Sequence, residues 1–219
     1  MSDTIRNYAA VLFDFDGTLI DSYPAIAASV NHVRARHGLG ALPVAEVKRH
    51  VGHGAEYLLT HTVPAGILLE NLEDYKAHHP SVVNALTTLL PGAAELLRLL
   101  DRAGKKIALC SNKPRKFSVA ILEHFELYPY FDAVLGPENV PLPKPAPDMV
   151  RVALERLDVD CEKALYVGDM TVDIQTARAA GTHVWVVPTG SEERAALECA
   201  EPDRLLDDLR ELVAEASRI

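Results

Sequence analysis

Two aspartates stand one residue apart at the end of an apolar run, in the stretch VLFDFDGTLIDS that spans residues 11–22. Asp14 and Asp16 direct like charges toward nearly the same point, an arrangement that costs free energy unless a positive group lies beside them. Gly17 follows directly and permits a tight backbone turn next to Asp14. The motif therefore predicts a site that holds a cation.

A second pair of aspartates supplies further carboxylates. Asp169 and Asp173, in the stretch GDMTVD, are four residues apart at the predicted start of a helix, so both can lie on one helix face. Together with Asp14 and Asp16 they would place three or four carboxylates in one pocket. Oxygen ligands without a paired histidine or cysteine favour Mg²⁺ over zinc.

Three other polar residues suit an anion. Lys144, in the stretch LPKPAPD, stands between prolines that stiffen the chain, and its compact positive charge fits a phosphate. Ser111 and Asn112, in the stretch SNKP, end an apolar run and open a helix, so they offer hydroxyl, amide and backbone donors. Carboxylates, a metal, a lysine and these donors together indicate phosphoryl transfer.

Buried strands are predicted to position these residues. Five short apolar runs read as strands, at residues 9–14, 106–111, 132–136, 164–169 and 183–188. Helical patterns separate several of them, which predicts the α/β class with a doubly wound, Rossmann-like parallel sheet. Ligands bind such sheets beyond the carboxyl ends of the strands, where the strand order reverses. Asp14, Ser111 and Asp169 each follow one of these runs and are expected to meet there.

The intervening helices have clear apolar faces. One contains Leu96 to Leu100, another Val119 to Phe125, a third Val150 to Leu157, and a fourth runs from Asp169 to a glycine stop at Gly181. A closing helix is predicted from Leu205, Leu206, Leu209 and Leu212. Three cations after the second strand, Lys113, Arg115 and Lys116, are interpreted as a solvated helix start.

The stretch from about Tyr23 to Leu90 differs from the rest, because it shows helical periodicity and breakers but no convincing strand. An insert of this size, joined to the sheet at both ends, predicts a small all-helical cap. The predicted division is an α/β core made of residues 1–20 and 91–219, and a cap made of residues 21–90.

Composition excludes several classes of partner. The 219-residue chain carries a net charge of −9, which argues against a nucleic-acid or membrane surface. Residues 1–8 are polar, and no run approaches the roughly 18 apolar residues that span a bilayer. The three cysteines show no metal-ligand spacing, so a reducing cytoplasm is expected.

Four motifs in order carry a resemblance to a known family: DFDGT from Asp14, SNKP from Ser111, KP at Lys144 and GDMTVD from Gly168. The chain resembles the haloacid dehalogenase superfamily across essentially its whole length. The position of the insert resembles the helical type of cap in that family. The SNKP form, with VGHGA from Val51 in the cap, is most similar to the phosphoglycolate phosphatase branch.

The resemblance implies a role for each acidic residue. Asp14 would be the nucleophile that forms an aspartyl phosphate, and Asp16 would protonate the leaving alkoxide and then deprotonate the hydrolytic water. Mg²⁺ would be held by Asp14, the backbone carbonyl of Asp16, and Asp169. Asp173 would support the metal through water or through the other ligands.

The resemblance also implies the substrate contacts. Gly17, Thr18, Ser111, Asn112 and Lys144 would surround the phosphoryl group. The branch usually carries asparagine in the cap at the position of His53, so His53, or its neighbours Arg49 and His50, is expected to contact the leaving group. The cap histidines His50, His53, His61, His78 and His79 show no convincing zinc-ligand spacing.

The implied function is a Mg²⁺-dependent phosphatase for a small phosphorylated metabolite, with 2-phosphoglycolate as the first candidate. A sugar phosphomutase of the β-phosphoglucomutase type and an inorganic pyrophosphatase remain alternatives on the same scaffold. A dehalogenase is disfavoured because it has no alkoxide for Asp16 to protonate. A non-catalytic sensor of phosphorylated metabolites is disfavoured because every catalytic position is filled.

Overall fold

A computed structural model describes residues 4–219, so the first three residues of the predicted core segment 1–20 lie outside the described residues. Six strands form a parallel sheet in the order β5-β4-β1-β6-β7-β8. They are β1 (Ala10–Phe13), β4 (Lys106–Cys110), β5 (Ala133–Leu135), β6 (Ala164–Gly168), β7 (His183–Val186) and β8 (Arg204–Leu205). The predicted α/β class and doubly wound sheet are confirmed, and all five predicted strands form.

Both faces of the sheet are buried, which explains why its strands read as continuous apolar runs. In β1, Val11 and Phe13 belong to one hydrophobic cluster, whereas Ala10 and Leu12 belong to the cluster on the opposite face. This alternation follows from the two-residue period of a β-strand. The sheet is therefore the middle layer of the core.

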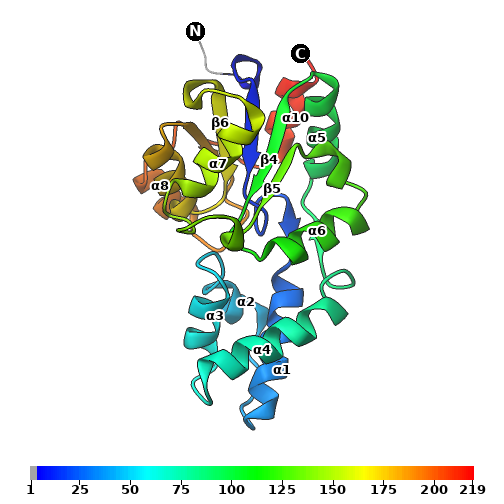
Figure 1. The fold of residues 1–219 in the computed structure, drawn as a ribbon, viewed down its shortest axis with the longest axis vertical. Helices are drawn as coiled ribbons and strands as arrows, with labels where there is room; N and C mark the ends of the chain where they lie inside the picture. Colours follow the sequence, from blue (N-terminus) through cyan, green and yellow to red (C-terminus); the bar gives the residue numbers. More distant parts are fainter. Residues whose placement is uncertain (1–3) are drawn as a thin grey trace.

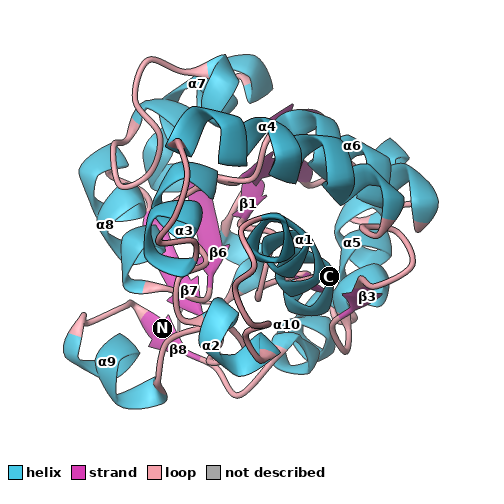
Figure 2. Cartoon of the chain, turned by 90° about the horizontal axis from the view of Figure 1, so that it is seen from below, coloured by secondary structure: helices cyan, strands magenta, loops and turns pink. Residues whose placement is uncertain are grey.

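Helices cover the two faces (Figures 1 and 2). Apolar residues of α5 (Ala93–Arg102), α6 (Arg115–His124) and α10 (Leu209–Ala216) pack in the cluster of Val11 and Phe13. Those of α7 (Asp148–Leu157), α8 (Thr171–Ala180) and α9 (Arg194–Cys199) pack in the other cluster. Short 3₁₀ turns complete the chain: η1 (Ile5–Asn7), η2 (His79–Ser81), η3 (Tyr128–Tyr130), η4 (Pro137–Asn139) and η5 (Cys161–Lys163).

The predicted closing helix begins later than its leucines indicate. Leu205 lies in β8, and the amide of Leu206 donates to the carbonyl of Val186, so this stretch pairs with the edge of the sheet. Helix α10 starts only after Asp208, whose carboxylate accepts from the amide of Arg210 at 2.7 Å and caps the helix. The prediction of a single helix from Leu205 was wrong because edge pairing overrides the local leucine pattern.

The stretch between Tyr23 and Leu90 contains one short strand that was not predicted. This strand, β3 (Thr88–Leu89), pairs antiparallel with β2 (Ile20–Asp21). The two strands are the outgoing and returning connections between the core and the helical insert. A pairing of two residues has no sequence period, so only the tertiary structure reveals it.

The insert itself is helical and has its own apolar cluster. Its helices are α1 (Tyr23–Arg36), α2 (Val44–Lys48), α3 (Ala55–Thr62) and α4 (Leu68–His78). The buried residues of this cluster all lie between Tyr23 and Tyr75, and Figure 1 shows these helices as a separate lobe below the sheet. The arrangement is that of a cap, and its bounds at residues 21 and 90 stay a prediction. None of the helices in the described chain combines the length and the apolar character needed to cross a bilayer.

Candidate active site

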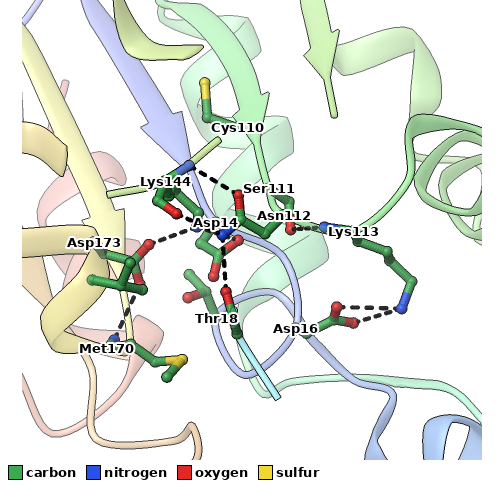
Figure 3. A network of polar contacts seen from close by, with 12 residues as sticks. Asp14, Asp16, Thr18, Cys110, Ser111, Asn112, Lys113, Lys144, Met170 and Asp173 are labelled. Carbon is green, nitrogen blue, oxygen red and sulfur yellow. Dashed lines mark hydrogen bonds and ion pairs between the residues drawn. The ribbon is translucent and has the colours of Figure 1, made fainter. Parts of the chain in front are cut away.

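The site begins where three neighbouring strands end. Phe13 is in register with Leu109 of β4 and with Val167 of β6, so the residues that follow these strands emerge at one edge of the sheet. The amide of Asp14 donates to the carbonyl of Val167 at 2.9 Å, which continues the pairing by one residue. Asp14, Ser111 and the residues after β6 therefore lie close together (Figure 3).

Lys144 lies between two carboxylates. Its Nζ is 2.9 Å from Oδ1 of Asp14 and 2.7 Å from Oδ1 of Asp173, and its side chain is only 1% exposed. Burial alone lowers the pKa of Lys144, but Asp14 and Asp173 raise that pKa above its ordinary value. The ammonium group is therefore charged and fixed in the centre of the site.

Asn112 holds Lys144 in this place. Its Oδ1 accepts from the amide of Lys144 at 3.0 Å, and its Nδ2 donates to the carbonyl of Lys144 at 3.1 Å. The same Nδ2 donates to the carbonyl of Gly52 in the cap at 3.0 Å. The side-chain amide of Asn112 thus connects Lys144 and the cap, and the predicted contact of Asn112 with phosphate stays a prediction.

Three carboxylates form one buried cluster. Asp14, Asp169 and Asp173 each offer an oxygen, and these oxygens lie within 4.8 Å of one another. Burial raises the pKa of Asp14 to about 6, although Lys144 lowers it. Burial, followed by the charges of Asp14 and Asp173, raises the pKa of Asp169 well above its usual range. Burial therefore disfavours the charged forms of these carboxylates more than Lys144 favours them.

The residues of this cluster fit a divalent cation. Three carboxylates and the single ammonium of Lys144 leave a formal charge of −2 when all are ionised. Oδ2 of Asp169 is buried without a hydrogen-bond partner among residues 4–219. An unpartnered anionic oxygen within a set of oxygen donors is the environment that a hard divalent metal ion prefers.

Asp169 and Asp173 have different hydrogen-bond partners. Oδ1 of Asp169 accepts from the hydroxyl of Thr18 at 2.6 Å, whereas its Oδ2 has no hydrogen-bond partner among the described residues. Oδ2 of Asp173 accepts from the amides of Asp169 and Met170 at 3.1 Å each, and its Oδ1 pairs with Lys144. Asp173 therefore fixes the backbone of Asp169. Thr18, which belongs to the DFDGT motif, orients the carboxylate of Asp169.

Asp16 points away from this cluster, toward a second lysine. Lys113 Nζ lies 3.0 and 3.2 Å from the two carboxylate oxygens of Asp16, and the hydroxyl of Ser22 donates to Oδ1. The side chain of Lys113 is 4% exposed. The interpretation of Lys113 as part of a solvated helix start was wrong, whereas Lys116 is exposed as expected. The SNKP motif contains Lys113, so the signal was present in the sequence.

Two glycines let the backbone approach Asp169. A Cβ atom on Gly17, which has a φ of +91°, would lie 2.5 Å from Oδ2 of Asp169. A Cβ atom on Gly190 would lie only 1.5 Å from the same oxygen. Gly17 was predicted as a site residue, whereas Gly190 was missed because nothing in its sequence neighbourhood points to the site.

A cavity of about 50 Å³ lies between this site and the cap. The core contributes polar and apolar side chains, among them Asp14, Asp16, Ser111, Asn112, Lys113 and Phe117. The cap contributes Ile26, Val51, Ala55, Leu58, Tyr75 and His79. The nucleophile and the acid–base residue implied by the resemblance thus line the same cavity.

The cap residues that were expected to contact the leaving group do not line this cavity. His53 is exposed, and its ring lies 4.8 Å from that of Tyr57. Arg49 pairs with Glu46 at the surface, and His50 stacks on the ring of His61. The structure instead places Tyr75 and His79 at the cavity, and no sequence pattern distinguished them from the other cap residues.

Comparisons with known proteins agree with this geometry. Residues 11–187 match the family described as haloacid dehalogenase-like hydrolase. A phosphoglycolate phosphatase from Cereibacter sphaeroides (strain ATCC 17025 / ATH 2.4.3) is 39% identical, over 78% of this chain and 81% of that protein. A phosphoglycolate phosphatase from Pseudomonas fluorescens (strain Pf0-1) is 30% identical, over 93% of this chain and 78% of that protein.

Solved structures share the fold. The crystal structure of a predicted phosphoglycolate phosphatase from Haemophilus somnus is similar with a TM-score of 0.87 at 25% identity, covering 96% of this chain and 98% of that one. A hydrolase of the haloacid dehalogenase-like family from Streptococcus pneumoniae has a TM-score of 0.85 at 22% identity, with coverage of 96% and 99%. These likenesses extend over core and cap together.

Proposed function

Because the chain belongs to the haloacid dehalogenase-like hydrolase family, we propose that it is a cytoplasmic, Mg²⁺-dependent phosphatase for a small phosphorylated metabolite. One observation carries the proposal: buried Lys144 bridges Asp14 and Asp173 beside the unpartnered oxygen of Asp169. The names of the relatives make 2-phosphoglycolate the first candidate substrate. The free state of all three cysteines suits a reducing compartment.

In the first step, a carboxylate oxygen of Asp14 attacks phosphorus, and the bond from phosphorus to the leaving oxygen breaks. The leaving alkoxide takes a proton from the carboxylic acid of Asp16, which becomes a carboxylate. The location of Asp16 supports this role, since it lines the same cavity as Asp14 while its side chain pairs with Lys113 outside the carboxylate cluster. The product of the step is an aspartyl phosphate on Asp14.

In the second step, the Asp16 carboxylate takes a proton from a water molecule, whose oxygen attacks the phosphorus of the aspartyl phosphate. The bond from phosphorus to the Asp14 oxygen breaks, so phosphate leaves and Asp14 returns to its carboxylate form. Lys113 and Ser22 hold the Asp16 carboxylate in one orientation between the two steps. Each step needs only one proton transfer, and Asp16 donates or accepts the proton in both.

Charge on the phosphoryl group requires positive partners. Lys144, from the loop before α7, lies next to Asp14, and Ser111 directly follows β4; both would contact the phosphoryl oxygens. Asp14, Asp169 and the backbone carbonyl of Asp16 would hold Mg²⁺, which when bound neutralises charge on the carboxylates and the phosphoryl oxygens. Thr18 and Asp173 would keep Asp169 in place for that purpose.

The cap, proposed as residues 21–90, would exclude bulk water during the first step and admit it for the second. The bond from Asn112 to the Gly52 carbonyl supports this role, because it joins the cap directly to the residue that positions Lys144. The small volume of the cavity, about 50 Å³, favours a small leaving group. By volume it holds roughly three to five water-sized positions.

The test is release of inorganic phosphate from a panel of phosphomonoesters that includes 2-phosphoglycolate, with Mg²⁺ and with EDTA. The proposal expects release that requires Mg²⁺ and that is lost in the Asp14→Asn variant. Pyrophosphate and β-glucose 1-phosphate belong in the panel, since phosphate from the former or glucose 6-phosphate from the latter would identify a pyrophosphatase or a mutase. No release from any ester with Mg²⁺ would refute the proposed activity.

A further inference from the structure

The part of the cavity formed by the cap is uncharged. Its side chains from the cap are aliphatic or aromatic, apart from the phenol of Tyr75 and the imidazole of His79. The one lysine among the described lining residues is Lys113, which comes from the core and already pairs with Asp16. Among the described residues that line the cavity, the cap therefore offers no cation to a charged leaving group.

One polar atom of this wall is left without a partner. His79 is fully buried, and its Nδ1 lies 2.9 Å from the hydroxyl oxygen of Ser29. Its Nε2 is buried and has no hydrogen-bond partner within residues 4–219. The ring stacks on that of Tyr75 at 5.2 Å and makes a T-shaped contact with the ring of Phe117 at 4.8 Å. His79 is one of the residues that line the cavity, and with Ser29 at Nδ1 its Nε2 is the ring nitrogen that has no partner among the described residues.

We assign the proton of the His79 ring from the contacts of Ser29. The Ser29 hydroxyl has one hydrogen, and it donates to the carbonyl of Ala25 at 3.2 Å. With that hydrogen on the Ala25 carbonyl, the oxygen accepts from Nδ1–H of His79 at 2.9 Å and from Nδ1 of His78 at 3.2 Å, an assignment that leaves Nε2 of His79 as a bare acceptor. Burial, followed by the charge of Lys113, lowers the pKa of His79 to about 2. The ring is neutral at ordinary pH, so Nε2 stays an acceptor.

We propose that His79 is a specificity-determining residue whose Nε2 accepts a hydrogen bond from a hydroxyl group on an uncharged leaving group. The inference rests on the proposed phosphatase function and refines its substrate class. A buried acceptor without a partner carries a desolvation cost, and a hydroxyl donor from the substrate removes that cost. A carboxylate at the same point brings an uncompensated negative charge against a lone pair and an apolar wall.

The two arguments on substrate rank different compounds first. The names of the relatives favour 2-phosphoglycolate, whose leaving group carries a carboxylate. The cavity wall favours a small ester with a hydroxyl group and no charge beyond the phosphate, such as sn-glycerol 3-phosphate. Propyl phosphate is the matched control compound, because it has the same three-carbon length and lacks the hydroxyls.

The experiment compares kcat/KM for these three esters in the Mg²⁺-loaded wild-type protein and in three variants. The wild type is expected to favour sn-glycerol 3-phosphate over propyl phosphate by about tenfold or more, which corresponds to one hydrogen bond. The wild type is also expected to favour sn-glycerol 3-phosphate over 2-phosphoglycolate. In His79→Phe the ratio of kcat/KM for sn-glycerol 3-phosphate to that for propyl phosphate falls to about one. His79→Gln, which keeps an acceptor, restores part of this ratio.

His78→Phe is the matched control variant. His78 is the neighbour of His79, also contacts Ser29, and does not line the cavity, so the same substitution there leaves the ratio unchanged. Circular dichroism and thermal unfolding verify that each variant is folded. A wild-type ratio that persists in His79→Phe, or a preference for 2-phosphoglycolate over sn-glycerol 3-phosphate, overturns the inference.

Calorimetric binding of the same esters to Asp14→Asn, with and without His79→Phe, separates this inference from the proposed function. One outcome is that the wild type shows no turnover, but binding favours sn-glycerol 3-phosphate over propyl phosphate and His79→Phe removes this preference. That outcome rejects the phosphatase and keeps the role of His79. Turnover with a ratio that does not depend on His79 keeps the phosphatase and rejects that role. Absence of both turnover and preference rejects both.

Discussion

Gly190 is the residue whose substitution tests the geometry of the site most directly. A Cβ atom added there would lie 1.5 Å from Oδ2 of Asp169, 2.4 Å from its Cγ and 2.8 Å from its Cβ. The backbone of Gly190 is outside the left-handed region, so Gly190→Ala adds a steric contact without backbone strain. The clash falls on the oxygen that the proposal assigns to the metal.

The size of the effect follows from these distances. Real Cβ contacts stay above 3.0 Å, so the Asp169 oxygen must move by at least the 1.5 Å that separates this limit from the present distance. Thr18 holds the other oxygen of that carboxylate at 2.6 Å, and Glu192 accepts from the amide of Thr171 at 2.8 Å, so neither side moves freely. A misplacement of about 1 Å costs roughly 100-fold in rate. We expect kcat/KM of Gly190→Ala to fall by at least about 100-fold.

The assay is hydrolysis of p-nitrophenyl phosphate over a range of Mg²⁺ concentrations, with thermal unfolding measured in the presence and absence of Mg²⁺. Gly190→Ala is expected to need more Mg²⁺ for half-maximal rate and to gain less in Tm from the metal. Gly40→Ala is the control, because Gly40 is exposed and a Cβ there meets no atom within 4 Å. Activity of Gly190→Ala within about threefold of wild type, at an unchanged Mg²⁺ requirement, would refute the assignment of Asp169 to the metal.

Three other predictions concern the aspartates. Asp14→Asn is expected to reduce phosphate release below about one thousandth while circular dichroism stays unchanged, since it removes the nucleophile; retained turnover would show that another group attacks. Asp16→Asn is expected to lower kcat by about 10² to 10⁴ and to keep the Mg²⁺-induced gain in Tm, because its side chain lies outside the carboxylate cluster; near-normal rates would remove its acid–base role. Burial raises the pKa of Asp14 to about 6 and that of Asp169 above its usual range, so these groups bind protons more tightly in the folded protein than in the unfolded chain. The stability of the metal-free protein therefore falls as the pH rises through the raised pKa values. Tm without metal should therefore be lower at pH 7.5 than at pH 5, and Mg²⁺ should raise Tm more at pH 7.5; the opposite order would contradict the charge assigned to the cluster.

The arrangement of the core was predictable because its strands are buried on both faces. Such strands appear as apolar runs, and the polar residue after each run marks its carboxyl end. Asp14 and Ser111 lie where this reasoning placed them, next to the segment that follows β6. The short strands β3 and β8 were not predictable, since two residues define no period and their pairing depends on partners far along the chain.

The residues that surround the site were less predictable than those at its centre. Lys113 lies in a motif, yet its burial depends on the position of the Asp16 carboxylate, 97 residues away in sequence. Gly190 and His79 have no motif, and their importance follows from what approaches them in space: Asp169 in one case, Ser29 and the cavity in the other. Sequence patterns encode the elements, whereas these contacts arise only after the elements pack.

Asp14 and Asp16 would repel each other if their carboxylates shared one point, and the fold directs the two carboxylates to different places. Residues two apart in a regular strand share a face, but β1 ends at Phe13 and the chain turns at Gly17, where φ is +91°. Asp14 consequently pairs with Lys144 in the carboxylate cluster, and Asp16 pairs with Lys113 outside it. Two carboxylates held in different electrostatic environments can take different protonation roles, which is what a nucleophile and a neighbouring acid–base group require. The repulsion that first indicated one shared cation is thus met by two lysines, to which the proposed mechanism adds one metal, and the turn at Gly17 separates the two roles.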